Sequence, residues 1–326
     1  SEGGSAAYLT DPSGYVFDPN VPPSTDAGYV RALRAYLFWE QIPGALYRQW
    51  ASEHVDIYQN IIESYLNNYS TANNTENLDF HNQAVQYFMD HPNAMWEEFY
   101  NQFFTTPCEK IKAQRNDDNF KKRMDTLQGK TGLKKETGYI QKWGGAYEYK
   151  DNASATDNAN SLTLPDVSTN TYIKGFAHTH VDNYEFIDPA DGETKIKIGI
   201  KNFSPADVAY FMDLIQNAQT KGHSLSDVYG VMISSGVNYQ IRFTGNQYQI
   251  KTFTDAQMEA HRDPYTDNMR DFIGNQKKLE LGFLKYIDEK MNLKGITLYR
   301  MNTDGSNTEI KLNADKTNTV ETNCPN

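Results

Sequence analysis

The chain has 326 residues and a net charge of −11, and 38% of its residues are hydrophobic, a globular composition with room for two domains. Its acidic charge and the absence of long Lys/Arg runs argue against a broad phosphate-binding surface, so nucleic acid and anionic membranes are not expected partners. No apolar run approaches the roughly 18 residues of a membrane-spanning helix, so we expect no transmembrane segment.

The first 26 residues are rich in Gly, Ser, Pro and Asp and lack hydrophobic periodicity, which predicts a flexible arm over 1–26. The absence of an initial Met suggests export to the periplasm or cell surface after removal of a signal segment, with a cytoplasmic location as the alternative. The two cysteines, Cys108 and Cys324, leave both options open: one long-range disulfide in an oxidising compartment, or two free thiols in a reducing one.

Residues 27–128 predict a helical N-terminal region. Apolar residues recur at three- and four-residue spacing through RALRAYLFWEQI, YRQWASEHVDIYQNIIESYLNNY, FHNQAVQYFMDH and NAMWEEFYNQFF. The clusters STANNTEN and DHPN mark turns between these helices.

Residues 129–255 predict an α+β domain. Short segments rich in β-branched and aromatic residues predict strands at GYIQKW, AYEYK, TYIKGFAHTH, VYGVMISS, NYQIRFTG and QYQIKTF. One helix interrupts them, with Ser204 as its N-cap, Pro205 in its first turn and Gly222 at its end. We expect residues 256–326 to form an appendage of one helical stretch and a β-hairpin around Asp304-Gly305.

The segment GFAHTHV carries two of the seven histidines. Residues two apart on a strand share one face, so His178 and His180 would present both imidazoles to the same side. Zinc accepts imidazole nitrogens and in catalytic sites usually has three protein ligands. A His-x-His strand end alone is more often incidental, and Ser204-Pro-Ala-Asp207 alone is explained as a helix start.

Together, Glu136 before GYI, His178-Thr-His180 and Ser204-Pro-Ala-Asp207 resemble the JAB/MPN (JAMM) metalloprotease family over about residues 130–250. This resemblance implies an α+β, cytidine-deaminase-like mixed sheet with helices. It also implies Zn2+ ligation by His178, His180 and Asp207, with Glu136 as general acid/base and Ser204 as a donor to the oxyanion. Glu148 is the competing general base, on a strand whose alternation suggests solvent exposure.

The sequence departs from the family pattern after the second histidine. Val181 stands where the family usually has Pro, and 26 residues separate His180 from Asp207, a longer interval than is usual. The extra residues, YEFIDPADGETKIKIGI, predict a β-hairpin that could form a lip at the site. Its acidic tip lacks the spacing of an EF-hand loop, which favours a solvated turn over a calcium site.

The sequence therefore predicts a zinc-dependent peptidase or isopeptidase that acts on a peptide or protein substrate through a metal-activated water. Two alternatives stay open: a catalytically inactive JAB/MPN-like binding or scaffolding protein of the cell envelope, and a surface protein whose metal is structural and closed by four ligands. The helix that starts at PCEKIK and the Asn- and Tyr-rich composition also resemble proteins of Bacteroidetes, which implies a lineage and no activity.

Overall fold

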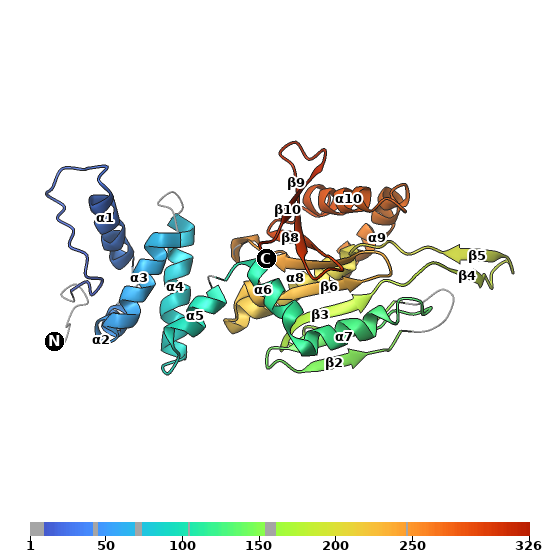
Figure 1. The fold of residues 1–326 in the computed structure, drawn as a ribbon, viewed down its shortest axis with the longest axis horizontal. Helices are drawn as coiled ribbons and strands as arrows, with labels where there is room; N and C mark the ends of the chain where they lie inside the picture. Colours follow the sequence, from blue (N-terminus) through green and yellow to red (C-terminus); the bar gives the residue numbers. More distant parts are fainter. Residues whose placement is uncertain (1–9, 42–44, 69–73, 104, 154–160, 246) are drawn as a thin grey trace. The chain divides into compact units, whose positions relative to one another are not determined.

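The computed structural model describes residues 10–41, 45–68, 74–103, 105–153, 161–245 and 247–326. The chain divides into two compact units, Ser1–Phe104 and Thr105–Asn326 (Figure 1). Each unit has its own hydrophobic core. The candidate site lies in the second unit.

The first unit is helical. Its helices are α1 (Ala27–Glu40), α2 (Ala45–Glu53), α3 (Val55–Asn68), α4 (Asn74–Asp90) and α5 (Trp96–Phe103). They enclose an aromatic core that includes Phe38, Tyr58, Tyr65, Phe88 and Phe99. Rings pack in tilted and edge-to-face pairs, such as Trp39 against Tyr58 with centroids 5.7 Å apart, an arrangement that aromatic side chains favour.

The described part of the predicted arm, residues 10–26, packs on these helices. The Tyr15 hydroxyl donates to Glu63 of α3 over 2.5 Å, and the Gln59 amide donates to the Pro12 carbonyl over 3.1 Å. This segment is therefore bound to the helical unit, in contrast to the flexible arm expected over 1–26; residues 1–9 lie outside the described part. The arm lacks periodicity because it contributes single anchoring side chains and no regular face.

The described residues of the second unit form a mixed sheet of eight strands, in the order β10-β9-β8-β7-β6-β3-β1-β2. Its strands are β1 (Gly138–Lys142), β2 (Tyr147–Lys150), β3 (Ile173–Thr179), β6 (Tyr229–Ile233), β7 (Asn238–Phe243), β8 (Ile296–Met301), β9 (Asn307–Leu312) and β10 (Thr319–Asn323). Strands β3 and β6 run parallel and the other neighbours antiparallel. The predicted α+β class with a mixed sheet is confirmed.

Helices cover both faces of this sheet. On one face, α8 (Pro205–Lys221), α9 (Asp255–Arg270) and α10 (Gln276–Glu289) bury the main core with Phe176, Met232 and Ile241. On the other face, α7 (Asp118–Gln128) packs Phe120 and Leu127 against β3 and β6, and α6 (Pro107–Asn116) lies against β9. The alternation of side chains along each strand accounts for the two separate cores.

The borders of the units differ from the predicted boundaries at 128/129 and 255/256. Helices α6 and α7 belong to the second unit because their apolar faces pack on its sheet. The expected appendage over 256–326 is an integral part of the same sheet, since β8 pairs with β7 and β9 pairs with β8. Its single predicted helical stretch consists of two helices, α9 and α10, separated by a turn at residues 271–275.

One predicted strand is wrong. Residues 247–253, QYQIKTF, contain only a short 3-10 helix over Gln247–Gln249 and no strand. Both sides of the preceding strand β7 are occupied, by β6 and β8, so no free edge is available next to this segment. Ile250 and Phe253 pack instead against the main core from a loop.

The two cysteines form a disulfide, with Cα atoms 5.5 Å apart. Cys108 lies in the first turn of α6 and Cys324 follows β10, so the bond joins the two ends of the second unit. The closed loop spans a sequence separation of 216 residues, for which the chain-entropy treatment gives a stabilisation of about 5 kcal/mol. Among the described residues, no helix combines the length and apolarity needed to span a bilayer.

We predict that Cys324→Ser lowers the free energy of unfolding of the second unit by about 2–5 kcal/mol, because the unfolded chain gains entropy when the loop opens. Chemical denaturation followed by near-UV circular dichroism measures this change. Reduction of the wild type should produce the same loss and should leave the variant unaffected. Equal stability of oxidised and reduced wild-type protein would contradict the role assigned to this bond.

Candidate metal centre

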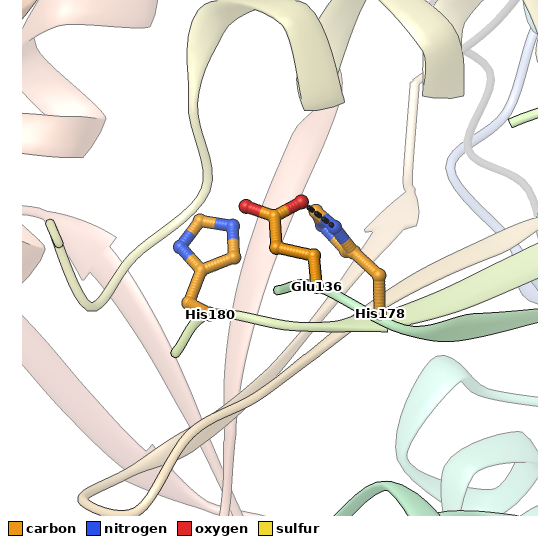
Figure 2. A group of neighbouring side chains, drawn as sticks. All are labelled: Glu136, His178 and His180. Atoms are coloured by element: carbon orange, nitrogen blue, oxygen red, sulfur yellow. Dashed lines mark ion pairs between the residues drawn. The ribbon is translucent and has the colours of Figure 1, made fainter. Parts of the chain in front are cut away.

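Strands β1 and β3 place three polar side chains on one face of the sheet. The two strands are antiparallel, and Gly138 pairs with His178. Residues two positions from either of these along its strand therefore point to the same face of the sheet. His180 continues this face beyond β3, and Glu136 continues it before β1. Figure 2 shows Glu136, His178 and His180 pointing to the same side of the two strands.

Gly138 provides the space under the site. A Cβ atom at this position would lie 2.6 Å from the Ala177 carbonyl oxygen and 3.1 Å from the His178 Cβ. No side chain fits there without a shift of the backbone. The glycine of the Thr-Gly-Tyr segment thus permits the close approach of β1 to the strand that carries the histidines.

The start of α8 brings a second carboxylate to this face. Ser204 caps the helix: its Oγ accepts a hydrogen bond from the Asp207 amide over 3.1 Å, and Asp207 Oδ2 accepts from the Ser204 amide over 2.9 Å. This reciprocal capping box directs the Asp207 carboxylate back across the first turn of the helix. The carboxylate thereby reaches both imidazole rings.

The ring of His180 is oriented by a backbone carbonyl. Its Nδ1 lies 2.8 Å from the Ile200 oxygen, and because a carbonyl can only accept, Nδ1 carries the hydrogen. The other nitrogen, Nε2, then faces Asp207 Oδ2 at 3.2 Å. Such a hydrogen bond to one ring nitrogen is the usual way in which proteins direct the other toward a metal.

His178 lies between the two carboxylates. Its Nδ1 is 3.6 Å from Glu136 Oε2 and its Nε2 is 3.2 Å from Asp207 Oδ1. Burial alone would lower the pKa of this imidazole, but the two carboxylates outweigh burial and raise the pKa to about 10. Burial would likewise raise the pKa of Asp207, but His178 and then His180 hold it well below its usual range.

These groups fit a bound cation. His178 Nε2 is buried and makes no hydrogen bond of good geometry to any residue that the structure describes, although Asp207 is close. One ligand atom from each of Glu136, His178 and His180 can be chosen so that all three lie within 4.8 Å of one another. Two imidazoles and two carboxylates in a largely buried space are donors that suit a divalent ion. The group Glu136, His178 and His180 could therefore hold a metal ion.

The structure brings together all five residues that the sequence singled out. Glu136 contacts His178, Asp207 contacts both histidines, and Ser204 contacts Asp207. Their roles stay predictions. Among the described residues, the ligand atoms found within 4.8 Å of one another belong to Glu136, His178 and His180, while Asp207, the predicted third ligand, lies 3.2 Å from one nitrogen of each histidine. Glu148, the competing base, lies elsewhere on β2 and pairs with Lys142 at 2.6 Å and Lys150 at 3.3 Å.

The predicted hairpin between His180 and Ser204 is present as β4 (Tyr184–Ile187) and β5 (Thr194–Lys197), which extend away from the sheet (Figure 1). At its tip, Lys195 pairs with Asp188 at 2.5 Å and with Asp191 at 2.9 Å. A lysine of the same hairpin thus offsets part of the negative charge of the tip, in agreement with a solvated turn.

The sequence did not indicate the backbone groups that orient the side chains of the site. Besides the Ile200 carbonyl, the Leu162 amide donates to Glu136 Oε2 over 3.1 Å. Both are backbone groups of irregular segments, for which the side-chain pattern gives no signal.

Comparisons of the chain with models of known protein families, with curated proteins and with solved structures gave no match.

We predict that Gly138→Ala destabilises the second unit by about 1–3 kcal/mol, because the added methyl group forces β1 away from the Ala177 carbonyl. Thermal unfolding measures the effect. Gly144→Ala is the matched control, since a Cβ at Gly144 meets nothing within 4 Å. Equal melting temperatures for the two variants would contradict the close approach.

Proposed function

We propose that the protein is a zinc-dependent peptidase or isopeptidase of the JAB/MPN type. The observation that carries the proposal is the meeting of His178, His180 and two carboxylates at one largely buried point, with His178 Nε2 lacking a good hydrogen bond within the described chain. In this proposal His178, His180 and Asp207 hold the zinc, and Glu136 is the general acid/base.

A bound zinc ion would lower the pKa of a coordinated water and polarise a peptide carbonyl. Glu136 is suited to accept a proton and return it to the leaving amine, since its carboxylate faces the site and is fixed by the Leu162 amide. The Ser204 hydroxyl oxygen accepts a hydrogen bond from the Asp207 backbone amide. The hydroxyl hydrogen therefore stays available to donate to a developing oxyanion.

In this account the β4–β5 hairpin is a lip that contacts the substrate, because both of its ends connect to site residues. One face of the hairpin exposes Ile187 and Ile196, and Ile198 follows directly after β5. These side chains are 64%, 59% and 50% exposed, respectively. Exposed apolar residues that share one face are typical of a surface that binds another chain.

The disulfide supports an exported location, in the periplasm or at the cell surface. Disulfides form and persist in oxidising compartments and are rare in the cytosol of mesophiles. The bond between Cys108 and Cys324 connects secondary-structure elements of the second unit and is structural in placement. This observation weighs against the cytoplasmic alternative.

A second candidate function is a binding or scaffolding role without catalysis. It is favoured by the contacts of the site itself, since Asp207 lies 3.2 Å from one nitrogen of each imidazole and can pair with them without a metal. Buried pairs of this kind also occur as purely structural networks. Zinc content and hydrolysis separate the two candidates.

We predict about one zinc per chain in wild-type protein purified without chelators or nickel resin, and loss of most of this zinc in Asp207→Asn. The amide cannot supply the anionic oxygen that the two imidazoles face. Plasma emission spectrometry measures the metal, and far-UV circular dichroism checks the fold. Absence of zinc in both proteins, even after zinc is added, would favour the binding role.

We predict that Glu136→Gln retains zinc but loses peptide hydrolysis by a factor of about 10²–10⁴, because the amide cannot transfer the proton. Fluorogenic peptide libraries and isopeptide-linked peptides serve as substrates. Glu148→Gln is the control, since Glu148 lies on β2 and pairs with Lys142 of β1 and Lys150 of β2. Loss of zinc in Glu136→Gln with retention in Asp207→Asn would exchange the roles of the two carboxylates.

A further inference from the structure

The segment that connects the hairpin to α8, residues 200–204, makes contacts to two of the proposed ligands. We refer to this segment as the strap. At its start, the Ile200 carbonyl accepts from His180 Nδ1 over 2.8 Å. At its end, Ser204 forms the capping box that directs Asp207. A displacement of the strap would therefore move His180 and Asp207 together.

The strap belongs to no strand of the described sheet, so its backbone groups need other partners. Side chains and backbone of α9 and α10 provide them. The side-chain amide of Gln276 donates to the Lys201 carbonyl over 3.1 Å. The side-chain amide of Asn202 donates to the Leu279 carbonyl over 3.4 Å. The Tyr265 hydroxyl donates to the Phe203 carbonyl over 2.6 Å, the shortest of these three hydrogen bonds.

These contacts are buried. Asn202 and Phe203 are fully buried, and Tyr265 is 3% exposed. Burial, and then the negative charge of Asp207, raise the pKa of the Tyr265 phenol well above its usual value, so the hydroxyl keeps its hydrogen and can donate it. A buried hydrogen bond of this kind fixes its acceptor firmly, because breaking it leaves both groups without water.

We propose that Tyr265 is a positioning residue that sets the metal affinity of the site through the strap. Within the described chain, Tyr265 forms no hydrogen bond to a proposed ligand side chain. Its hydroxyl donates to the carbonyl of Phe203, the residue directly before the Ser204 cap. The C-terminal helices thereby couple to the geometry of His180 and Asp207. This inference rests on the proposed metal site.

The test compares Tyr265→Phe with Tyr286→Phe. The two rings pack edge to face with centroids 5.0 Å apart, and both tyrosines are 3% exposed. The Tyr286 hydroxyl contacts His261 Nδ1 at 2.8 Å and makes no hydrogen bond to the strap within the described chain. Each variant removes one hydroxyl from the pair of helices α9 and α10. A general loss of stability in this core should therefore change the zinc affinity of both variants to the same extent.

We expect Tyr265→Phe to weaken zinc binding by about tenfold, as substitution of groups behind metal ligands commonly does, and Tyr286→Phe to change it by less than about twofold. Chelator competition measures the dissociation constants. Amide hydrogen exchange of metal-free protein gives a second readout: exchange of the Asp207 amide should accelerate in Tyr265→Phe alone.

Equal zinc affinity in Tyr265→Phe and the wild type would overturn the positioning role, and so would an equal loss in both variants. If the wild type binds no zinc, the proposed function fails. The exchange rate of the Asp207 amide then decides whether Tyr265 positions the strap, and an unchanged rate would overturn that role as well.

Discussion

The candidate site depends on one carboxylate shared by two imidazoles. Asp207 lies 3.2 Å from a nitrogen of His178 and 3.2 Å from a nitrogen of His180, and all three side chains are largely removed from water. Charged groups in such a place are costly unless each has a partner. The second carboxylate, Glu136, adds a negative charge beside His178, so the cluster is balanced only when protons or a metal cation occupy the space between the groups.

The rest of the second unit holds this cluster in place. The pairing of β1 with β3 aligns Glu136 with the histidines, and the capping box of α8 orients Asp207. Hydrogen bonds from α9 and α10 hold the strap that connects His180 to Asp207. The buried ion pair of Glu280 with Arg300, at 2.6 Å, and the hydrogen bond from Tyr239 to Glu280 connect α10 to β7 and β8. The disulfide joins α6 to the residue that follows β10 and so links the two ends of the second unit covalently.

The sequence predicted the parts of the site that follow from local rules. Strand periodicity placed His178 and His180 on one face, and the Ser-Pro-Ala-Asp start placed the helix cap, because both patterns depend on residues within one turn or one strand. The integration of β8 to β10 into the sheet was not predictable in this way, since strand pairing joins segments far apart in the chain. Strand β10 carries mostly exposed side chains and has no apolar alternation to indicate it. Tyr265 was missed for a similar reason: it meets Phe203 across a separation of 62 residues.

The most direct measurement is X-ray diffraction from crystals of zinc-loaded protein at energies above and below the zinc absorption edge. The account predicts one strong anomalous peak, about 2.0–2.2 Å from a nitrogen of His178, a nitrogen of His180 and one carboxylate oxygen. The identity of that carboxylate, Asp207 or Glu136, would separate the ligand from the general base. A map without a peak between the two histidines, while His178 remains paired with Asp207, would contradict the account.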